Sequence, residues 1–372
     1  GLLRDETNAV SVLTDRSIFG ATKDQEAILS RLPAANAAQL RAALTASPTT
    51  VALFENNSGL QPYVSRTRST SLRLDHTVNA TDRVFLRLSH AGGGDSNAST
   101  KALVGASRGS KADHFDTVAA AGWTKGITAT LLNDLRVQGS YHELAVQSSE
   151  PFGPELNIAG FGFFNKDIFL PFDGISRYLE IRNNITRVGA AHTFKAGVQI
   201  LVRGEHQDSK TFSGGRFGFG TLPAGLVNAA LASTSITALQ AFNLGLPQSY
   251  QQGFGDGTVA GTLPLYGFFA QDSWKVRRNL TLDFGLRYEV DQRKSPLPTD
   301  KNNLAPRFGF AWDPKGDGKT SIRGGYGFFY APTYFQIDYV ANALGIVNGR
   351  RQIAQVLTTI QTAGPAAANN IY

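Results

Sequence analysis

Histidines and carboxylates are the residues of this sequence that could do chemistry, but their spacing forms no known catalytic or metal motif. The six histidines, at positions 76, 90, 114, 142, 192 and 206, contain no HxH or HxxxH pair. The run from His142 to Val146 is a zinc-protease motif that lacks its second histidine, and it lies in an alternating, strand-like segment. The alternative is a catalytic or metal site assembled from residues of distant loops. We expect no enzymatic activity, no local metal site and no cofactor.

Residues 313–320, DPKGDGKT, imitate the end of a phosphate-binding loop. Such a loop needs a glycine where Asp313 stands and a helix after Thr320, whereas the following residues alternate as in a strand. As a calcium loop it places Lys315 where an oxygen ligand is needed. The segment therefore predicts a tight turn rich in glycine and aspartate.

Composition excludes several classes of protein. The 372 residues include no cysteine and no methionine, so thiolate chemistry is absent, and 17% charged residues is below the usual ~25%. The net charge of +7 is spread without a run of five basic residues, so we expect no nucleic-acid partner. The start, GLLR, is neither a signal peptide nor an initiator, which we interpret as a piece of a longer chain. Frequent aromatic residues and glycines indicate β-structure.

The clearest periodicity in the sequence is two. Within residues 280–290, Leu280, Leu282, Phe284 and every second residue up to Val290 are apolar or aromatic, and the residues between them are mostly polar. Eleven alternating residues match a tilted membrane-spanning strand of ~9–11 residues better than a soluble strand of about five or six. Ten segments alternate in this way: 70–78, 83–90, 115–125, 133–146, 178–187, 192–203, 264–276, 279–290, 306–312 and 320–330.

The connections between these segments alternate in length. Short links are expected at 79–82, 126–132, 188–191, 277–279 and 313–319, and long links at 91–114, 147–177, 204–263 and 291–305. Short turns at one end and long loops at the other are typical of outer-membrane barrels, where the short side is periplasmic. The predicted fold is all-β, an antiparallel transmembrane β-barrel of about ten long strands, partial, with long loops and short loop helices.

The N-terminal part differs from the rest. Residues 23–32 and 36–46 predict two short helices, and residues 223–246 look helical inside the longest loop. We divide the chain into an N-terminal loop or helical segment at 1–66, a partial barrel at 67–345, and a loop or truncated tail at 346–372. A separate small helical domain at 1–66 is the alternative.

Charged residues on the polar faces of the strands are the candidate functional residues. They are predicted to face the lumen of the barrel, and they are Asp283, Arg287, Glu289, Lys195 and Arg203. The alternative is the solvated face of a soluble sheet. Trp123, Trp274 and Trp312 lie near strand ends, where an interfacial aromatic girdle is expected, although ordinary core packing explains any single one equally well.

Residues 266–290, YGFFAQDSWKVRRNLTLDFGLRYEV, and 302–330, NNLAPRFGFAWDPKGDGKTSIRGGYGFFY, resemble the barrel of TonB-dependent outer-membrane receptors. Within them the pattern looks most like the Oar-like branch common in acidobacteria, and residues 68–89 and 185–203 are similar to the same branch. The resemblance covers roughly residues 68–345.

The resemblance implies a barrel of about 22 strands in the outer membrane of a Gram-negative cell. It also implies uptake of a scarce solute, such as a siderophore or an oligosaccharide, with force from the TonB complex acting through a plug. No plug or TonB box is recognisable in this chain, so the predicted partners are the lipid bilayer, an unknown small solute and TonB through a plug absent from this sequence. Two alternatives stay open: a passive porin-like channel, and a secreted β-rich adhesin or carbohydrate-binding protein.

Overall fold

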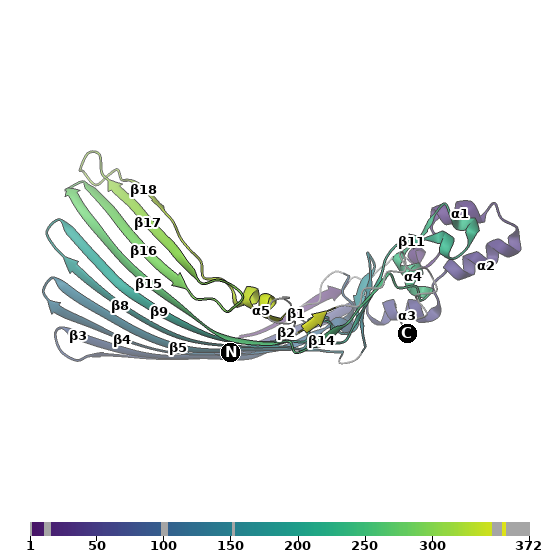
Figure 1. The fold of residues 1–372 in the computed structure, drawn as a ribbon, viewed down its shortest axis with the longest axis horizontal. Helices are drawn as coiled ribbons and strands as arrows, with labels where there is room; N and C mark the ends of the chain where they lie inside the picture. Colours follow the sequence, from purple (N-terminus) through teal and green to yellow (C-terminus); the bar gives the residue numbers. More distant parts are fainter. Residues whose placement is uncertain (1, 11–15, 98–102, 151–152, 344–351, 355–372) are drawn as a thin grey trace.

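A single curved antiparallel sheet dominates the structure (Figure 1). The structure is a computed structural model that describes residues 2–10, 16–97, 103–150, 153–343 and 352–354. The sheet has eleven strands in the order β1-β2-β3-β4-β5-β8-β9-β15-β16-β17-β18. Their bounds are β1 Leu2–Val10, β2 Gly59–Thr77, β3 Asp82–Ser96, β4 Ser110–Thr128, β5 Leu131–Ser148, β8 Phe172–Val188, β9 His192–Ser209, β15 Thr258–Arg277, β16 Leu280–Asp291, β17 Asp300–Trp312 and β18 Ile322–Gly327.

All ten expected strands are present in this sheet, and its eleventh strand, β1, was not expected. β1 lies inside the segment 1–66 that was predicted to be loop or helix, and β2 begins at Gly59, before the expected boundary at residue 67. β1 pairs with residues 59–67 of β2, whereas residues 68–77 of β2 pair with β3 alone within the described part of the chain. Within the described residues, the sheet is open along this edge and along β18, and these two edges do not pair with each other.

The predicted alternation of short and long connections is confirmed from β2 to β16, whereas the connection at 292–299 after β16 is no longer than the turn at 313–321 after β17. The tight turns after β2, β4, β8, β15 and β17 all lie at one end of the sheet, at the left of Figure 1, and the long connections lie at the other. Local side chains close two of these turns. The Asn79 carboxamide accepts from the amides of Thr81 and Asp82, at 2.8 and 2.9 Å.

The segment that imitates a phosphate-binding loop is such a turn. The Asp313 carboxylate accepts from the amides of Gly316 and Gly318 at 2.9 and 2.7 Å. Both glycines have positive φ, +68° and +72°, which side chains with a Cβ rarely adopt. The glycines therefore serve the turn between β17 and β18.

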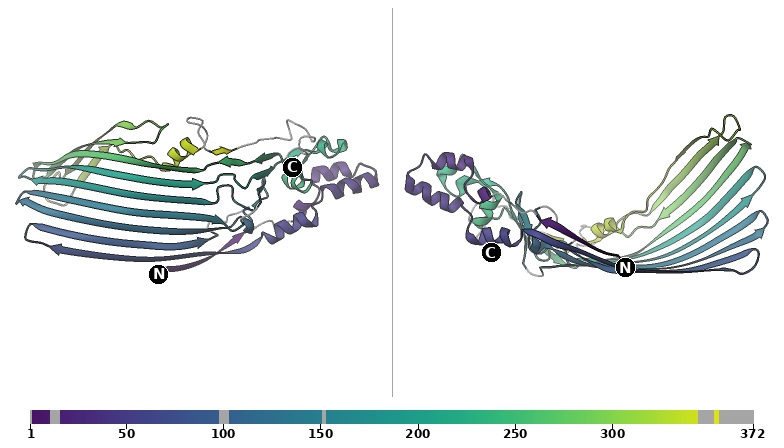
Figure 2. Two further views of the ribbon diagram at one scale, coloured as in Figure 1. Left: turned by 60° about the horizontal axis from the view of Figure 1, so that its bottom comes forward. Right: turned by 180° about the vertical axis from the view of Figure 1, so that it is seen from behind.

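A compact lobe of short elements stands beyond the long-loop end of the sheet (Figures 1 and 2). It contains η1 Arg16–Phe19, α1 Lys23–Leu29, α2 Ala34–Leu44, α3 Pro48–Asn56, β6 Glu155–Ile158, β7 Gly162–Phe164, β10 Arg216–Phe219, β11 Leu222–Pro223, η3 Ala224–Leu226, η4 Ala229–Leu231, β12 Ser235–Ile236, α4 Ala238–Asn243 and β13 Ser249–Gln251. β6, β7, β10 and β13 form a four-stranded sheet of their own. η2 Ala106–Arg108 connects β3 to β4 beside β7.

The two N-terminal helices of the sequence prediction are confirmed, and α3 is additional. The helix predicted at 223–246 is wrong for most of its length, because α4 is its one α-helix and 3-10 turns with a two-residue strand pair precede it. Thr237 explains where α4 begins. Its hydroxyl accepts from the Gln240 amide at 3.1 Å while the Gln240 side chain accepts from the Thr237 amide at 3.0 Å, which is a capping box.

The N-terminal helices and the loop after β9 share one hydrophobic core. Leu29, Leu40 and Leu44 pack with Leu231 and Ile236, all nearly inaccessible to solvent. A buried contact joins Gln25 and Gln240, whose side-chain amides lie 2.9 Å apart. Both predicted helical regions are therefore parts of one loop assembly.

The segment after β18 folds back over the sheet. It contains α5 Phe335–Ala343, which lies on the concave side of the curved sheet (Figures 1 and 2). Further along, β19 Gln352–Ala354 pairs with β14 Gly253–Gly255. Apart from β19, the tail predicted at 346–372 lies outside the described residues. No helix in the described ranges is long and apolar enough to cross a membrane.

Candidate functional site

The sheet has one apolar and one polar face, and the strand register decides which residues share each. Residues directly opposite each other on paired strands point to the same side. Leu282 is opposite both Trp274 and Phe310, and Phe284 is opposite Phe308. Arg203 lies on the other face, and it bonds the segment before α5, which Figure 1 places on the concave side. The polar face is therefore concave and the apolar face convex.

The convex face is apolar and uncovered. Its aliphatic and aromatic side chains remain 37–57% exposed, which is more than a water-soluble protein leaves contiguous across many strands. They are Leu72, Leu74, Leu86, Leu88, Val137, Leu179, Ile185, Phe194, Val198, Ile200, Phe268, Phe284, Leu286, Leu304 and Phe308. Such a face requires lipid, and strands of 15–20 residues such as β3, β4 and β15 are longer than the ~9–11 residues that a bilayer crossing needs.

The three tryptophans lie on this convex face at the short-turn end, as an interfacial girdle requires. The indole of Trp123 donates to the Asp82 carboxylate at 2.9 Å. Trp274 stacks on His192 with ring centroids 5.6 Å apart and an interplanar angle of 10°. His192 also bonds Asp272 at 2.6 Å, which accounts for the carboxylate that interrupts the apolar pattern of this strand.

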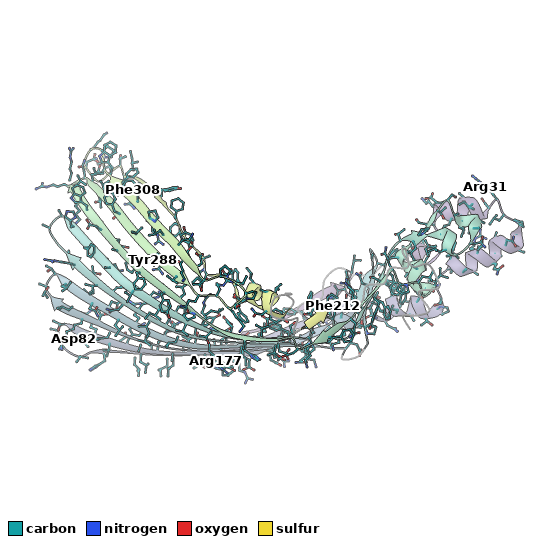
Figure 3. All side chains as sticks on the ribbon, in the orientation of Figure 1. Arg31, Asp82, Arg177, Phe212, Tyr288 and Phe308 are labelled. Carbon is teal, nitrogen blue, oxygen red and sulfur yellow. The ribbon has the colours of Figure 1, made fainter. Side chains whose placement is uncertain are left out.

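A second aromatic row marks the other border of the apolar band. The rings of His90, Phe115 and Tyr141 follow one another at centroid distances of 4.7 and 5.9 Å, and Arg177 lies over Tyr141 at 5.6 Å. Figure 3 shows Arg177 at the convex side of the sheet. On β4, Phe115 and Trp123 are separated by about 26 Å at ~3.3 Å per residue, which a strand tilt of ~40° reduces to about 20 Å of height. The two rows thus bracket an apolar band that is somewhat shorter than the ~25 Å typical of outer-membrane barrels.

All five predicted lumen residues lie on the concave face. Asp283 is opposite Ser273, Arg287 opposite Phe269 and Glu289 opposite Gly267. On β9, Lys195 is opposite Gln271 and Arg203 opposite Leu263. Arg287 and Glu289 form an ion pair at 2.6 Å. Arg203 does not take part in this pair and instead pairs with Asp291. Their role as lumen residues stays a prediction.

The concave face also carries a repeated arrangement of arginine and carboxylate that the sequence analysis missed. On β2, β5, β8 and β16 an arginine pairs with an acidic residue two positions away on the same strand. The pairs are Arg73–Asp75, Arg136–Asp134, Arg182–Glu180 and Arg287–Glu289, at 2.7, 3.0, 2.5 and 2.6 Å. The available signal was an arginine two positions before or after an aspartate or glutamate within an alternating segment.

These pairs join into a polar wall across the sheet. Gln199 connects two of them, because it accepts from Arg287 at 2.6 Å and donates to Glu180 at 2.5 Å. Around Phe85 lies a hollow of about 490 Å³ lined by Arg73, Arg136 and further polar residues. Arg73–Asp75 is the most exposed of these pairs, and an exposed ion pair stabilises a fold little, so its presence is better explained by the hydrated space that it faces than by stability.

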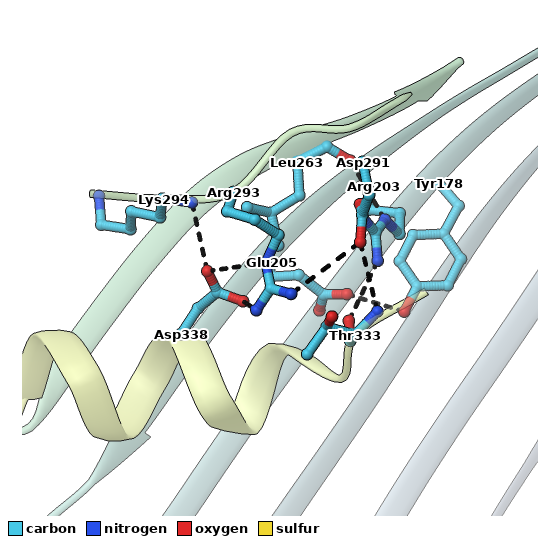
Figure 4. A network of polar contacts seen from close by, with 9 residues as sticks. All are labelled: Tyr178, Arg203, Glu205, Leu263, Asp291, Arg293, Lys294, Thr333 and Asp338. Atoms are coloured by element: carbon cyan, nitrogen blue, oxygen red, sulfur yellow. Dashed lines mark hydrogen bonds and ion pairs between the residues drawn. The ribbon is translucent and has the colours of Figure 1, made fainter. Parts of the chain in front are cut away.

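A buried ion-pair cluster fixes the segment before and within α5 to the concave face (Figure 4). Arg203 forms a short ion pair with Asp291 and donates to the Thr333 carbonyl at 3.2 Å. Arg293 pairs with Asp338 at 2.8 Å, and the Asp338 side chain has no solvent exposure. Arg203 is therefore on the predicted face but is covered, so it does not face open solvent.

Further contacts hold α5 itself. The hydroxyl of Tyr339 donates to the Ser209 carbonyl at 3.0 Å, and burial raises the pKa of Tyr339 so that this hydroxyl stays protonated. Gln207 donates to Gln336 at 3.1 Å. The segment 333–343 thus covers part of the concave face at its long-loop end and narrows the space above it. Among the described residues, no group of three His, Asp or Glu side chains is placed to hold a metal ion.

A family model described as an outer membrane beta barrel domain matches residues 21–296 and 291–371. The chain belongs to this family. Among solved structures it is similar to the outer membrane transporter YddB from Escherichia coli, with 12% identity and a TM-score of 0.50 over 74% of this chain and 33% of that one. It is also similar to the copper transporter OprC, with 13% identity and a TM-score of 0.50 over 77% of this chain and 40% of that one. A search of curated proteins finds no match.

The family match confirms the predicted fold class and places the chain in the outer membrane, in contact with the lipid bilayer. The family match gives no support to the alternative of a secreted adhesin. At such low identity the two transporters show a shared fold alone, and this chain spans 33% and 40% of their lengths.

Proposed function

We propose that this chain forms part of the barrel wall of a TonB-dependent outer-membrane receptor, of the Oar-like branch, that takes up a scarce solute. The observation that carries the proposal is the folded lobe at the long-loop end, together with the α5 segment that narrows the concave face. A receptor needs a structured entrance to capture a dilute solute, whereas a diffusion pore needs an open one.

In this proposal the long loops capture the solute, and the polar concave wall offers a hydrated path across the membrane. The side chains of the ion pairs on that wall offer hydrogen bonds that replace the water around a solute. Because each arginine of these pairs has a negative partner, the pairs present no unbalanced charge to the solute. The force comes from TonB through a plug domain that is not among these residues, and no enzymatic step is involved. A barrel larger than eleven strands is supported by the open edges and by the greater length of both similar transporters.

The dependence of solute uptake on TonB tests the proposal. The gene product that carries this chain is expressed in a Gram-negative host with and without TonB, and accumulation of candidate siderophores, cobalamin, oligosaccharides and peptides is measured. We expect accumulation of one class that needs TonB. Uptake that is equal without TonB, with steady ion conductance in planar bilayers, would support the passive channel instead.

A further inference from the structure

A cavity of about 470 Å³ opens on the concave face at its long-loop end, apart from the predicted lumen residues. One side is formed by β4, β5, β8 and β9, and the other by residues 334–336 at the start of α5. The volume is within the ~300–1,000 Å³ of small-molecule sites. Its position at the mouth of the polar wall places it where a solute arriving from the loops would first meet the barrel.

Four side chains of the strand wall form one row across neighbouring strands. Asp116 is opposite His142, His142 opposite Ser176, and Ser176 opposite Glu205. His142 bonds Asp116 at 2.5 Å, and Glu205 accepts from Ser176 and Tyr178 at 2.5 and 2.8 Å. These bonds orient both carboxylates and leave each oxygen a further lone pair for a donor on a ligand.

The charge of the lining disfavours anions. The chain has 36 lysines and arginines, yet none of the residues lining this cavity is one of them. An anionic group would approach Asp116 and Glu205 with no lysine or arginine in the lining to offset the repulsion. Ligands that donate hydrogen bonds to the two carboxylates are favoured, since bonds to an ionised acceptor are stronger than neutral ones.

Aromatic and amide groups complete the cavity. Tyr334 is 82% exposed at its edge, and Phe335 and Gln336 follow it. Gln207 and Gln336 bond each other through one amide group each, so the other half of each amide remains for a ligand. The buried contacts of Arg203, Asp291 and Asp338 hold this aromatic side in place before any ligand arrives.

We propose that this cavity binds a neutral sugar. A sugar ring presents an apolar C–H face that packs on an aromatic ring, and an edge of hydroxyls that need both donors and acceptors. Tyr334 supplies the first, and Asp116, Glu205 and the two glutamines supply the second. The inference names the solute class of the receptor proposed above and rests on that proposal for its role in uptake, but binding itself requires no TonB.

The test uses the purified gene product that carries this chain, in detergent, on a panel of immobilised neutral, amine-bearing and acidic oligosaccharides. Titration calorimetry follows for the sugars retained. We expect neutral sugars to be retained, with affinity that changes less than about twofold between low and high salt. Tyr334→Ala and Glu205→Gln should each weaken binding by about tenfold or more.

Tyr330→Ala is the matched control, because Tyr330 is half-exposed in the same segment but does not line the cavity. It should bind as the wild type does. Any of three results would overturn the proposed site. The first is that no neutral sugar is retained, and the second is that only amine-bearing sugars are retained, with steep salt dependence. The third is that both cavity variants bind sugar with unchanged affinity. TonB-independent uptake with intact sugar binding would instead contradict the proposed function alone.

Discussion

At the scale of single residues, neighbouring positions of one strand have opposite environments. Leu282 and Phe284 point to the convex apolar face, and Asp283 between them points to the concave polar face. A guanidinium on the convex face would lie in hydrocarbon, whereas one on the concave face would stay hydrated.

An arginine on the lipid face costs about 2–4 kcal/mol near the membrane midplane and less toward an interface, so Phe284→Arg should destabilise the barrel more than Leu282→Arg, because Leu282 is opposite the girdle residue Trp274. Asp283→Arg needs no comparable desolvation. We expect the first two variants to lower the folded fraction in outer membranes sharply, measured by heat-modifiable gel migration, and Asp283→Arg to keep it. An equal loss of folded protein in all three variants would contradict the assignment of the convex face to lipid and of the concave face to water.

The ion pairs of the concave side also differ in burial, which separates their energies. Asp338 is fully buried against Arg293, whereas Asp75 is 61% exposed beside Arg73. Removing one partner of a buried pair leaves an uncompensated charge, which costs about 3–5 kcal/mol, and an exposed pair contributes roughly 0–1 kcal/mol.

Asp338→Asn should release the segment 333–343, and proteinase K should then cleave it in intact cells. Asp75→Asn is the control and should leave the cleavage pattern of the wild type. A segment that stays protected in Asp338→Asn would show that the cluster does not hold it.

At the scale of elements, local patterns predicted strands and turns but not the contacts between distant segments. The strand at 280–290 and the turn at 313–319 follow from alternation and from glycines beside Asp313, which act within a few residues. Arg203 contacts Asp291 and Thr333, which are 88 and 130 positions away, so its burial had no local signal. The helix predicted at 223–246 failed because the packing of this loop on the N-terminal helices decides its conformation.

The shared core of the lobe gives a prediction at this scale. Gln240 is 2% exposed and donates to Gln25 and to the Gly20 carbonyl at 2.9 and 3.1 Å. Gln240→Leu removes the donor to the Gly20 carbonyl and the acceptor of the Thr237 amide, and each group that is left without a partner costs about 1–3 kcal/mol. Hydrogen exchange should then accelerate in residues 16–57 together with 222–246, while the long strands stay protected.

Gln39→Leu, on the exposed side of α2, is the control and should change neither region. Faster exchange in the loop with unchanged exchange in the N-terminal helices would mean that the two regions do not fold as one lobe.

At the scale of the whole molecule, the sheet combines an uncovered apolar face with two edges that find no partner among the described residues. Unpaired edges and contiguous apolar surface both promote association. Expressed by itself, the 372-residue chain should aggregate without detergent. A monomeric, detergent-free sample that melts cooperatively would contradict this account of the sheet.

In a membrane-spanning arrangement the convex face contacts lipid and the concave face does not, which fluorescence quenching by labelled lipids can measure residue by residue. The chain has no cysteine, so single cysteines can be placed at each position from 281 to 289 and labelled with an environment-sensitive dye. In the gene product reconstituted with spin-labelled lipids, we predict strong quenching at 282, 284, 286 and 288, and weak quenching at 281, 283, 285, 287 and 289. Uniform quenching along the strand, or strong quenching at the odd positions, would contradict the membrane-spanning arrangement.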